Sequence, residues 1–166
     1  MSNDAIVILK DDHARIRALF KKFQSSSPGA HVTRGDLVNQ IIQELTVHTY
    51  VENEVMYPQV RELVPDLEQD VLESYEEHHV ADLLCVELMA LKPTDEHFQA
   101  KTTVLIENVT HHIEEEEQDW FPKVRSALGR KQLSEIGEQM LELKKTAPRH
   151  PAQPSALKKA ADALLS

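Results

Sequence analysis

Two short stretches of the sequence place a histidine and a glutamate on one face of a helix. Glu52 follows His48 by four residues, and Glu116 follows His112 by the same interval. Positions i and i+4 lie one above the other on a helix, so each pair aims an imidazole and a carboxylate at one point. Imidazole and carboxylate together suit transition metals such as iron. The spacing therefore predicts that each pair is half of a metal site.

The two stretches also end alike. Tyr57-Pro58 closes the first and Phe121-Pro122 closes the second, at equal distances from the histidine. The repeat predicts that two helices bring equivalent ligand pairs to one shared centre.

Helical phase identifies two more histidines that face inward. At about 100° per residue, His13 and His78 fall on the apolar stripes of their own helices. Their competitors His79 and His111 lie about 100° away from the stripes, and Glu117 lies about 140° from the ligand face. We therefore expect the first two at the centre and the other three elsewhere.

Six inward polar groups would have too few partners inside an apolar bundle that held no cation. They exceed the ligand set of one tetrahedral zinc ion and suit a pair of iron or manganese ions. Two alternatives remain: each histidine is a hydrogen-bonded core residue, or the whole protein is a scaffold in which the histidines only pack. The predicted metal ligands are His13, His48, Glu52, His78, His112 and Glu116.

Apolar periodicity predicts helices and no strands, which makes the fold all-α. The expected helices span about 4–24, 34–57, 66–91, 96–128 and 131–145. Four long helices with short connections pack most simply as an antiparallel up-down-up-down four-helix bundle. Pro122 lies inside the fourth pattern and is expected to kink or split that helix.

The predicted organisation has three parts. Residues 1–128 form the metal-binding bundle, and 129–147 form an additional helix packed on it. A proline-rich segment and C-terminal tail occupy 148–166, where 155–166 reads as a short amphipathic helix or a frayed end.

The composition weighs against several classes of protein. A net charge of −10 over 166 residues disfavours nucleic acid and anionic membrane as partners. The single cysteine, Cys85, excludes an intramolecular disulfide and is expected in the core. We see no signal peptide and no apolar run of membrane-spanning length, so a cytoplasmic location is expected.

The combined pattern H, HxxxE, H, HxxxE resembles the hemerythrin-like HHE cation-binding domains, in their bacterial branch, over roughly residues 4–128. The resemblance implies an up-down four-helix bundle that holds an oxo- or hydroxo-bridged di-iron centre. Glu52 and Glu116 would be the bridging carboxylates.

The pattern departs from the oxygen-carrying hemerythrins of invertebrates, which place a further histidine where this chain has Asp82 and use His-x-x-x-x-Asp on the fourth helix. Reversible oxygen carriage is therefore not the favoured function. Asp82 is a candidate for an additional ligand or an outer hydrogen-bond acceptor. Tyr57 is a second candidate, for which apolar packing beneath the proline turn is the alternative.

The resemblance implies a small diatomic or peroxide ligand. The expected function is to handle O2, H2O2 or NO, with catalase-like peroxide decomposition in an oxidative-stress role. The alternative is an iron or oxygen sensor, or an iron-binding module, that has no turnover.

Overall fold

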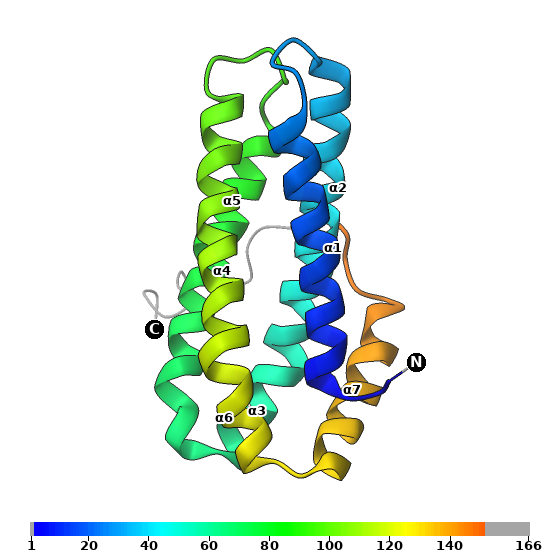
Figure 1. The fold of residues 1–166 in the computed structure, drawn as a ribbon, viewed down its shortest axis with the longest axis vertical. Coiled ribbons are helices and arrows are strands. Elements are labelled where there is room, and N and C mark those ends of the chain that lie inside the picture. The colour runs from blue at the N-terminus through cyan, green and yellow to red at the C-terminus, as the bar shows by residue number, and fades with distance from the viewer. Residues whose placement is uncertain (1, 152–166) are drawn as a thin grey trace, which may run out of the picture.

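The computed structural model describes residues 2–151, and over that range the chain is all helical with no strand. Four long helices run alternately up and down side by side (Figure 1). This is the expected bundle; the interpretation of 155–166 falls outside the described residues. The long helices are α1 (Ala5–Ser25), α2 (His31–Val51), α4 (Glu68–Met89) and α5 (Phe98–Glu115).

Shorter segments extend the second and the fourth of these helices past their prolines. After α2 come η1 (Glu52–Met56), α3 (Tyr57–Leu63) and η2 (Pro65–Leu67). After α5 come η3 (Glu116–Trp120) and α6 (Phe121–Ala127). The last helix within residues 2–151, α7 (Arg130–Lys144), packs against the outside of α1 (Figure 1).

The two proline turns have the same local structure. Pro58 and Pro122 lack an N–H, and the proline ring would collide with the carbonyl four residues earlier in a regular α-helix. In both places the chain instead widens to a π-turn, η1 before the first proline and η3 before the second. The Glu52 carbonyl accepts the bond from the N–H of Tyr57, five residues on, and the Glu116 carbonyl accepts it from Phe121. The helix thus runs on through Pro122, where we expected a kink or a break.

The apolar core has two parts with a polar layer between them. One cluster contains Leu9, Val51 and Val71, and the other contains Ile16 and Leu45. His13, His48 and His78 each fall between residues of the two clusters on their own helix, and all six predicted ligands are buried. The fold therefore interrupts its own apolar core at the level of the histidines.

Helix α7 covers the end of the bundle near the N-terminus. Its buried residues Leu133, Ile136 and Met140 join the same cluster as Leu9. Gly137 lies so close to the backbone of Asn3 that an added Cβ atom would stand 1.6 Å from the Asn3 carbonyl oxygen. The absence of a side chain at this position is what allows α7 to dock.

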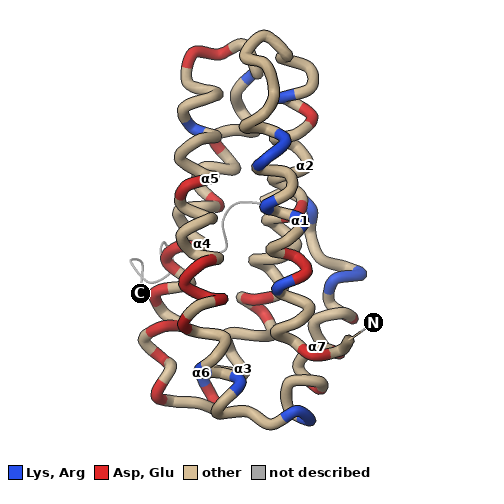
Figure 2. The backbone as a smooth tube through the Cα atoms, viewed as in Figure 1, with Lys and Arg blue, Asp and Glu red and all other residues tan. Residues whose placement is uncertain are grey.

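Charged positions are spread over every long helix, and acidic positions gather toward the end of the bundle that carries α3 and α6 (Figure 2). Among residues 2–151, no helix combines the length and the apolar character needed to cross a membrane.

Candidate metal centre

The structure brings the six predicted ligands together in two groups. Glu52, His78, His112 and Glu116 form one group, in which the candidate ligand atoms all lie within 4.8 Å of one another. His13 and His48 form the second group with Glu116, within the same limit. Because Glu116 belongs to both groups, its carboxylate can reach two cations at once.

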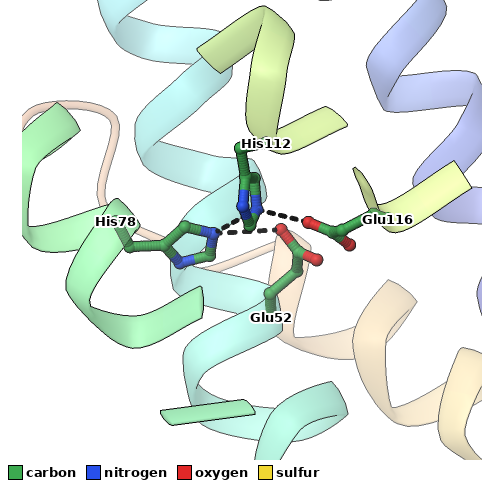
Figure 3. Close-up of side chains that lie close together, drawn as sticks. All are labelled: Glu52, His78, His112 and Glu116. Carbon is green, nitrogen blue, oxygen red and sulfur yellow. Dashed lines mark hydrogen bonds and ion pairs between the residues drawn. The ribbon is translucent and has the colours of Figure 1, made fainter. Parts of the chain in front are cut away.

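Figure 3 shows the first group, to which η1, α4, α5 and η3 each contribute one side chain. The Nε2 atoms of His78 and His112 are 3.0 Å apart, and His78 Nε2 lies 3.5 Å from Glu52 Oε1. His112 Nε2 also contacts Glu116 Oε1. The ligand atoms of four different segments thus converge on one point.

The second group mirrors the first. The rings of His13 and His48 meet edge to face, with centroids 4.9 Å apart, and those of His78 and His112 do the same at 4.8 Å. Glu52 Oε1 lies 2.7 Å from His48 Nε2. Glu52 therefore lies within 3.5 Å of a histidine of each group.

Each of the four histidines turns its Nδ1 atom toward an acceptor outside the centre. An Nδ1–H donor held in this way fixes the ring and leaves Nε2 free for a metal. The contacts follow a repeated pattern. The residues that precede His13 and His78 accept from a histidine on the next long helix, and the residues that follow Glu52 and Glu116 accept from His78 and His13. The Nδ1 contacts are His13 with Glu117 at 3.2 Å, His48 with Asp12 at 3.0 Å, His78 with Asn53 at 2.8 Å and His112 with Glu77 at 3.3 Å.

Sequence reasoning missed all four acceptors. We expected Glu117 to play no part at the centre; it points away from the inner ligand face, but that direction leads to His13 on the neighbouring helix. The signal that could have found them is adjacency, since Asp12, Asn53, Glu77 and Glu117 each stand next to a predicted ligand in the chain.

Asp12 is the most strongly held of these acceptors. Burial alone would raise the pKa of its carboxyl, but the hydrogen bond and charge of His48, together with Lys144, outweigh burial and lower the pKa to about 2. Burial alone would lower the pKa of His48, yet Glu52 and Asp12 outweigh it and raise the pKa to about 10. Lys144 Nζ lies 2.6 Å from Asp12 Oδ1, so α7 is tied to the centre through a buried carboxylate.

The donor set fits a metal on the evidence of its unpaired atoms. His13 Nε2, His48 Nε2, both oxygens of Glu52 and Glu116 Oε2 are buried without a hydrogen bond. His48 Nε2 and Glu52 approach closely without the geometry of a hydrogen bond. Two ligands that face a common ion are arranged in this way. Burial and the nearby charge of Glu116 raise the pKa of Glu52, because two buried carboxylates repel each other without a cation between them. Leaving this many buried polar atoms unpaired costs free energy that cation binding would recover.

The tyrosine position distinguishes the two groups. The Tyr57 hydroxyl lies 3.2 Å from His78 Nε2 and 3.3 Å from His112 Nε2, and it donates to Glu116 Oε1 at 3.2 Å. Its counterpart Phe121 instead stacks on the ring of His13, with centroids 5.7 Å apart. One group therefore has a phenol oxygen at hand, whereas the other meets an apolar ring.

Asp82 lies outside both groups of ligand atoms. Burial raises the pKa of its carboxyl to about 6, although the charge of His79 acts in the opposite direction. Its position fits the centre less well than that of Tyr57.

Comparison with known proteins agrees with this geometry. Residues 4–124 match the family described as Hemerythrin HHE cation binding domain, and the chain belongs to that family. The crystal structure of a Hemerythrin HHE cation binding domain-containing protein from Mycobacterium kansasii has the same fold, with a TM-score of 0.72, 20% identity and 86% of each chain covered.

Two curated proteins are similar in sequence. An uncharacterized hemerythrin-like protein of Schizosaccharomyces pombe is 25% identical over 146 residues, which cover 87% of this chain and 70% of that protein. A protein named DNA nickase, from Nostoc sp. (strain PCC 7120), is 29% identical over 125 residues, or 75% of this chain. The match spans only 34% of the length of that Nostoc protein. The family and the buried histidine and glutamate groups together define a cation-binding helical module.

Proposed function

We propose that this protein holds two iron ions between its helices and reacts with dioxygen, hydrogen peroxide or nitric oxide. The observation that supports this is the pair of buried ligand groups that share Glu116, several of whose atoms have no other partner. In this proposal His13 and His48 hold one ion, His78 and His112 hold the other, and Glu52 bridges them with Glu116.

The chain controls the surroundings of such a pair. When bound, two iron ions supply redox chemistry toward small oxidants, and the protein sets coordination and access. The apolar clusters exclude bulk water from the two ends of the polar layer. The Tyr57 hydroxyl donates a hydrogen bond to Glu116 Oε1, and its oxygen lies close enough to His78 and His112 to act as a further ligand of an ion that these histidines would hold. We propose Tyr57 for that role ahead of Asp82.

The reaction we propose to test is the disproportionation of two molecules of hydrogen peroxide to two of water and one of dioxygen. Protein loaded anaerobically with iron is assayed for metal per chain and mixed with peroxide in an oxygen electrode. We expect two irons per chain, evolution of oxygen and a change in the near-ultraviolet and visible bands. Absence of both the oxygen and the spectral change rejects the proposal.

Matched variants show whether the centre is responsible. Glu116→Gln removes the shared carboxylate, and Glu114→Gln removes an exposed charge two residues away on the same helix. The first is expected to lose iron and the second to keep it. Unchanged iron in both His48→Ala and His112→Ala would instead support a scaffold in which the histidines only pack.

A sensor or iron-binding module without turnover is the second candidate. The observation that favours it is that the centre lies between the two halves of the core, so metal occupancy acts directly on the stability of the bundle. Iron that binds only the folded chain raises the melting temperature by mass action. A large rise in melting temperature with no oxygen evolution would favour this function over peroxide chemistry.

We do not propose a nickase activity for this chain from its similarity to the Nostoc protein. The shared part is a third of that protein, and the net charge of −10 opposes binding to a phosphate backbone.

A further inference from the structure

A cavity of about 240 Å³ opens between α4 and the helix formed by α5 and η3, and its floor is part of the centre. His112 and Glu116 line it at the bottom, together with Trp120. The rest of the lining is Ser74 and five carboxylates: Asp70, Glu73, Glu77, Glu115 and Asp119. Among residues 2–151, none of those that line this cavity is a lysine or an arginine, so the potential inside it is negative.

The opposite side of the centre provides an internal comparison. A second cavity, of about 450 Å³, lies between α1 and α2 and reaches His48. Its lining carries two carboxylates, Asp12 and Glu44, and four cations: Arg15, Lys22, Lys144 and Arg149. A cation approaching the centre is therefore attracted more strongly on the α4–α5 side than on the α1–α2 side, because a cleft lined by one sign of charge concentrates its counter-ions.

Three side chains at the acidic cavity could form an outer binding site for a cation. Glu77, His111 and Glu115 offer ligand atoms that lie within 4.8 Å of one another, and His111 Nε2 is 3.0 Å from Glu115 Oε1. His111 is 66% exposed and Glu115 is 48% exposed, so hydrated cations can reach them from solvent. Glu77 is shared with the interior, since its Oε1 lies 3.3 Å from His112 Nδ1.

An independent observation marks the inner end of the same path. The Glu116 side chain is only 2% exposed, and its Oε2 atom has no hydrogen-bond partner. A buried carboxylate oxygen at the bottom of an acidic cavity calls for a cation in particular, because burial of an unpaired charge is costly.

We propose that a divalent transition-metal cation enters the centre through this acidic cavity and docks first at Glu77, His111 and Glu115. The proposal rests on the proposed function, since the cation that docks is the one that the centre then holds. Lys123 reduces the negative charge at the mouth of the cavity, because its Nζ atom pairs with Asp119 at 3.0 Å and with Asp70 at 3.8 Å.

The rate of metal loading tests the path separately from the centre. Metal-free full-length protein is mixed rapidly with Co²⁺ at low ionic strength, and the visible absorption of the bound ion is followed to its end point. His111→Ala removes a ligand atom of the outer site, and Glu115→Gln removes a negative charge from it. Both variants are expected to load roughly 5- to 10-fold more slowly and to reach the wild-type amount of metal, since the changes act on the association rate. Lys123→Met is expected to load faster, and added salt should slow the wild type.

Glu142→Gln on α7 is the control for a single lost negative charge, because Glu142 is exposed and lies outside the cavity. It should load at the wild-type rate. His111 and Glu115 are also exposed, so their variants should fold normally.

The outer point has its own optical signal. Trp120, the only tryptophan of the chain, lines the cavity. Tb³⁺ added to protein whose centre is already loaded should therefore show emission sensitised by Trp120, and Glu115→Gln should reduce that emission several-fold. Equal emission from both proteins would count against the outer site.

The outcomes separate this proposal from the proposed function. If wild-type protein takes up no metal, the centre itself is rejected. If it fills but His111→Ala and Glu115→Gln load at the wild-type rate, the entry path is wrong and the centre stands. If the variants lose metal at the end point, these residues belong to the centre and not to an outer site.

Discussion

The Asp12→Asn substitution tests how the centre is held by the rest of the fold. Asp12 is 2% exposed, accepts from His48 Nδ1 at 3.0 Å and pairs with Lys144 of α7 at 2.6 Å. Asparagine keeps the shape of the side chain and its acceptor oxygen, but it removes the charge. The variant therefore weakens the contacts to both His48 and Lys144 without opening a cavity.

The magnitude follows from the pKa of Asp12. The charges and hydrogen bonds of its partners lower that pKa from 3.8 to about 2, against the opposing effect of burial. At about 1.36 kcal/mol per pKa unit, ionisation of Asp12 contributes about 2 kcal/mol to the free energy of unfolding at pH 7. For a chain of this length that loss lowers the melting temperature by roughly 4–8 °C.

The pH dependence gives the sign of the effect. A carboxyl whose pKa is lowered by folding stabilises the protein above its unfolded pKa, and the stabilisation disappears as pH falls through the folded value. The difference between wild type and Asp12→Asn should thus stay constant from pH 7 to about pH 5. It should shrink as pH falls below about 4.

Urea unfolding of the metal-free proteins measures this difference, with equal m-values as the check that only stability changed. Glu77→Gln is the matched control. Glu77 holds His112 in the equivalent way, but it is 19% exposed and pairs with no lysine or arginine within residues 2–151. If Asp12→Asn costs less than about 0.5 kcal/mol, or no more than Glu77→Gln, the reasoning from the buried pair is refuted.

Three further outcomes follow from the structure. Tyr57→Phe should keep two irons per chain, and its free energy of unfolding should fall by at most about 1 kcal/mol. The variant should lose any visible phenolate-to-iron absorption band. Survival of such a band would exclude Tyr57 as a ligand. Gly137→Ala gains about 1 kcal/mol of helix propensity. It should nevertheless lower the free energy of unfolding by about 1–3 kcal/mol, because its Cβ atom would stand 1.6 Å from the Asn3 carbonyl oxygen. A variant that is more stable in urea unfolding would contradict this packing. Asp82→Asn should stabilise the metal-free protein by about 3 kcal/mol at pH 7, since burial raises the Asp82 pKa from 3.8 to about 6 and makes its charge costly. Unfolding curves should show this gain vanish between about pH 6 and pH 4, with iron content unchanged; a loss of iron would make Asp82 a ligand.

The sequence alone determined the helical bundle and the types of the candidate ligands. Apolar residues at helical spacing identified the four long helices, and the same period placed His48 with Glu52 and His112 with Glu116 on single faces. These inferences succeed because i and i+4 contacts lie within one helix and need no knowledge of its neighbours. The all-α bundle is confirmed, and the structure brings the predicted side chains together.

Only the tertiary structure decided what surrounds the ligands. Asp12 and Glu117 serve histidines on other helices, so their roles depend on how the helices pack and not on their own phase.

The orientation of Tyr57 could not be predicted from a regular helix either. A straight α-helix would turn Tyr57 roughly 140° away from Glu52. The π-turn that accommodates Pro58 puts five residues in that turn, so Tyr57 follows Glu52 on one face and its hydroxyl reaches His78 and His112. The candidate ligands can thus be predicted from local spacing in the sequence. The difference between the two ligand groups arises from helix packing and from the two π-turns.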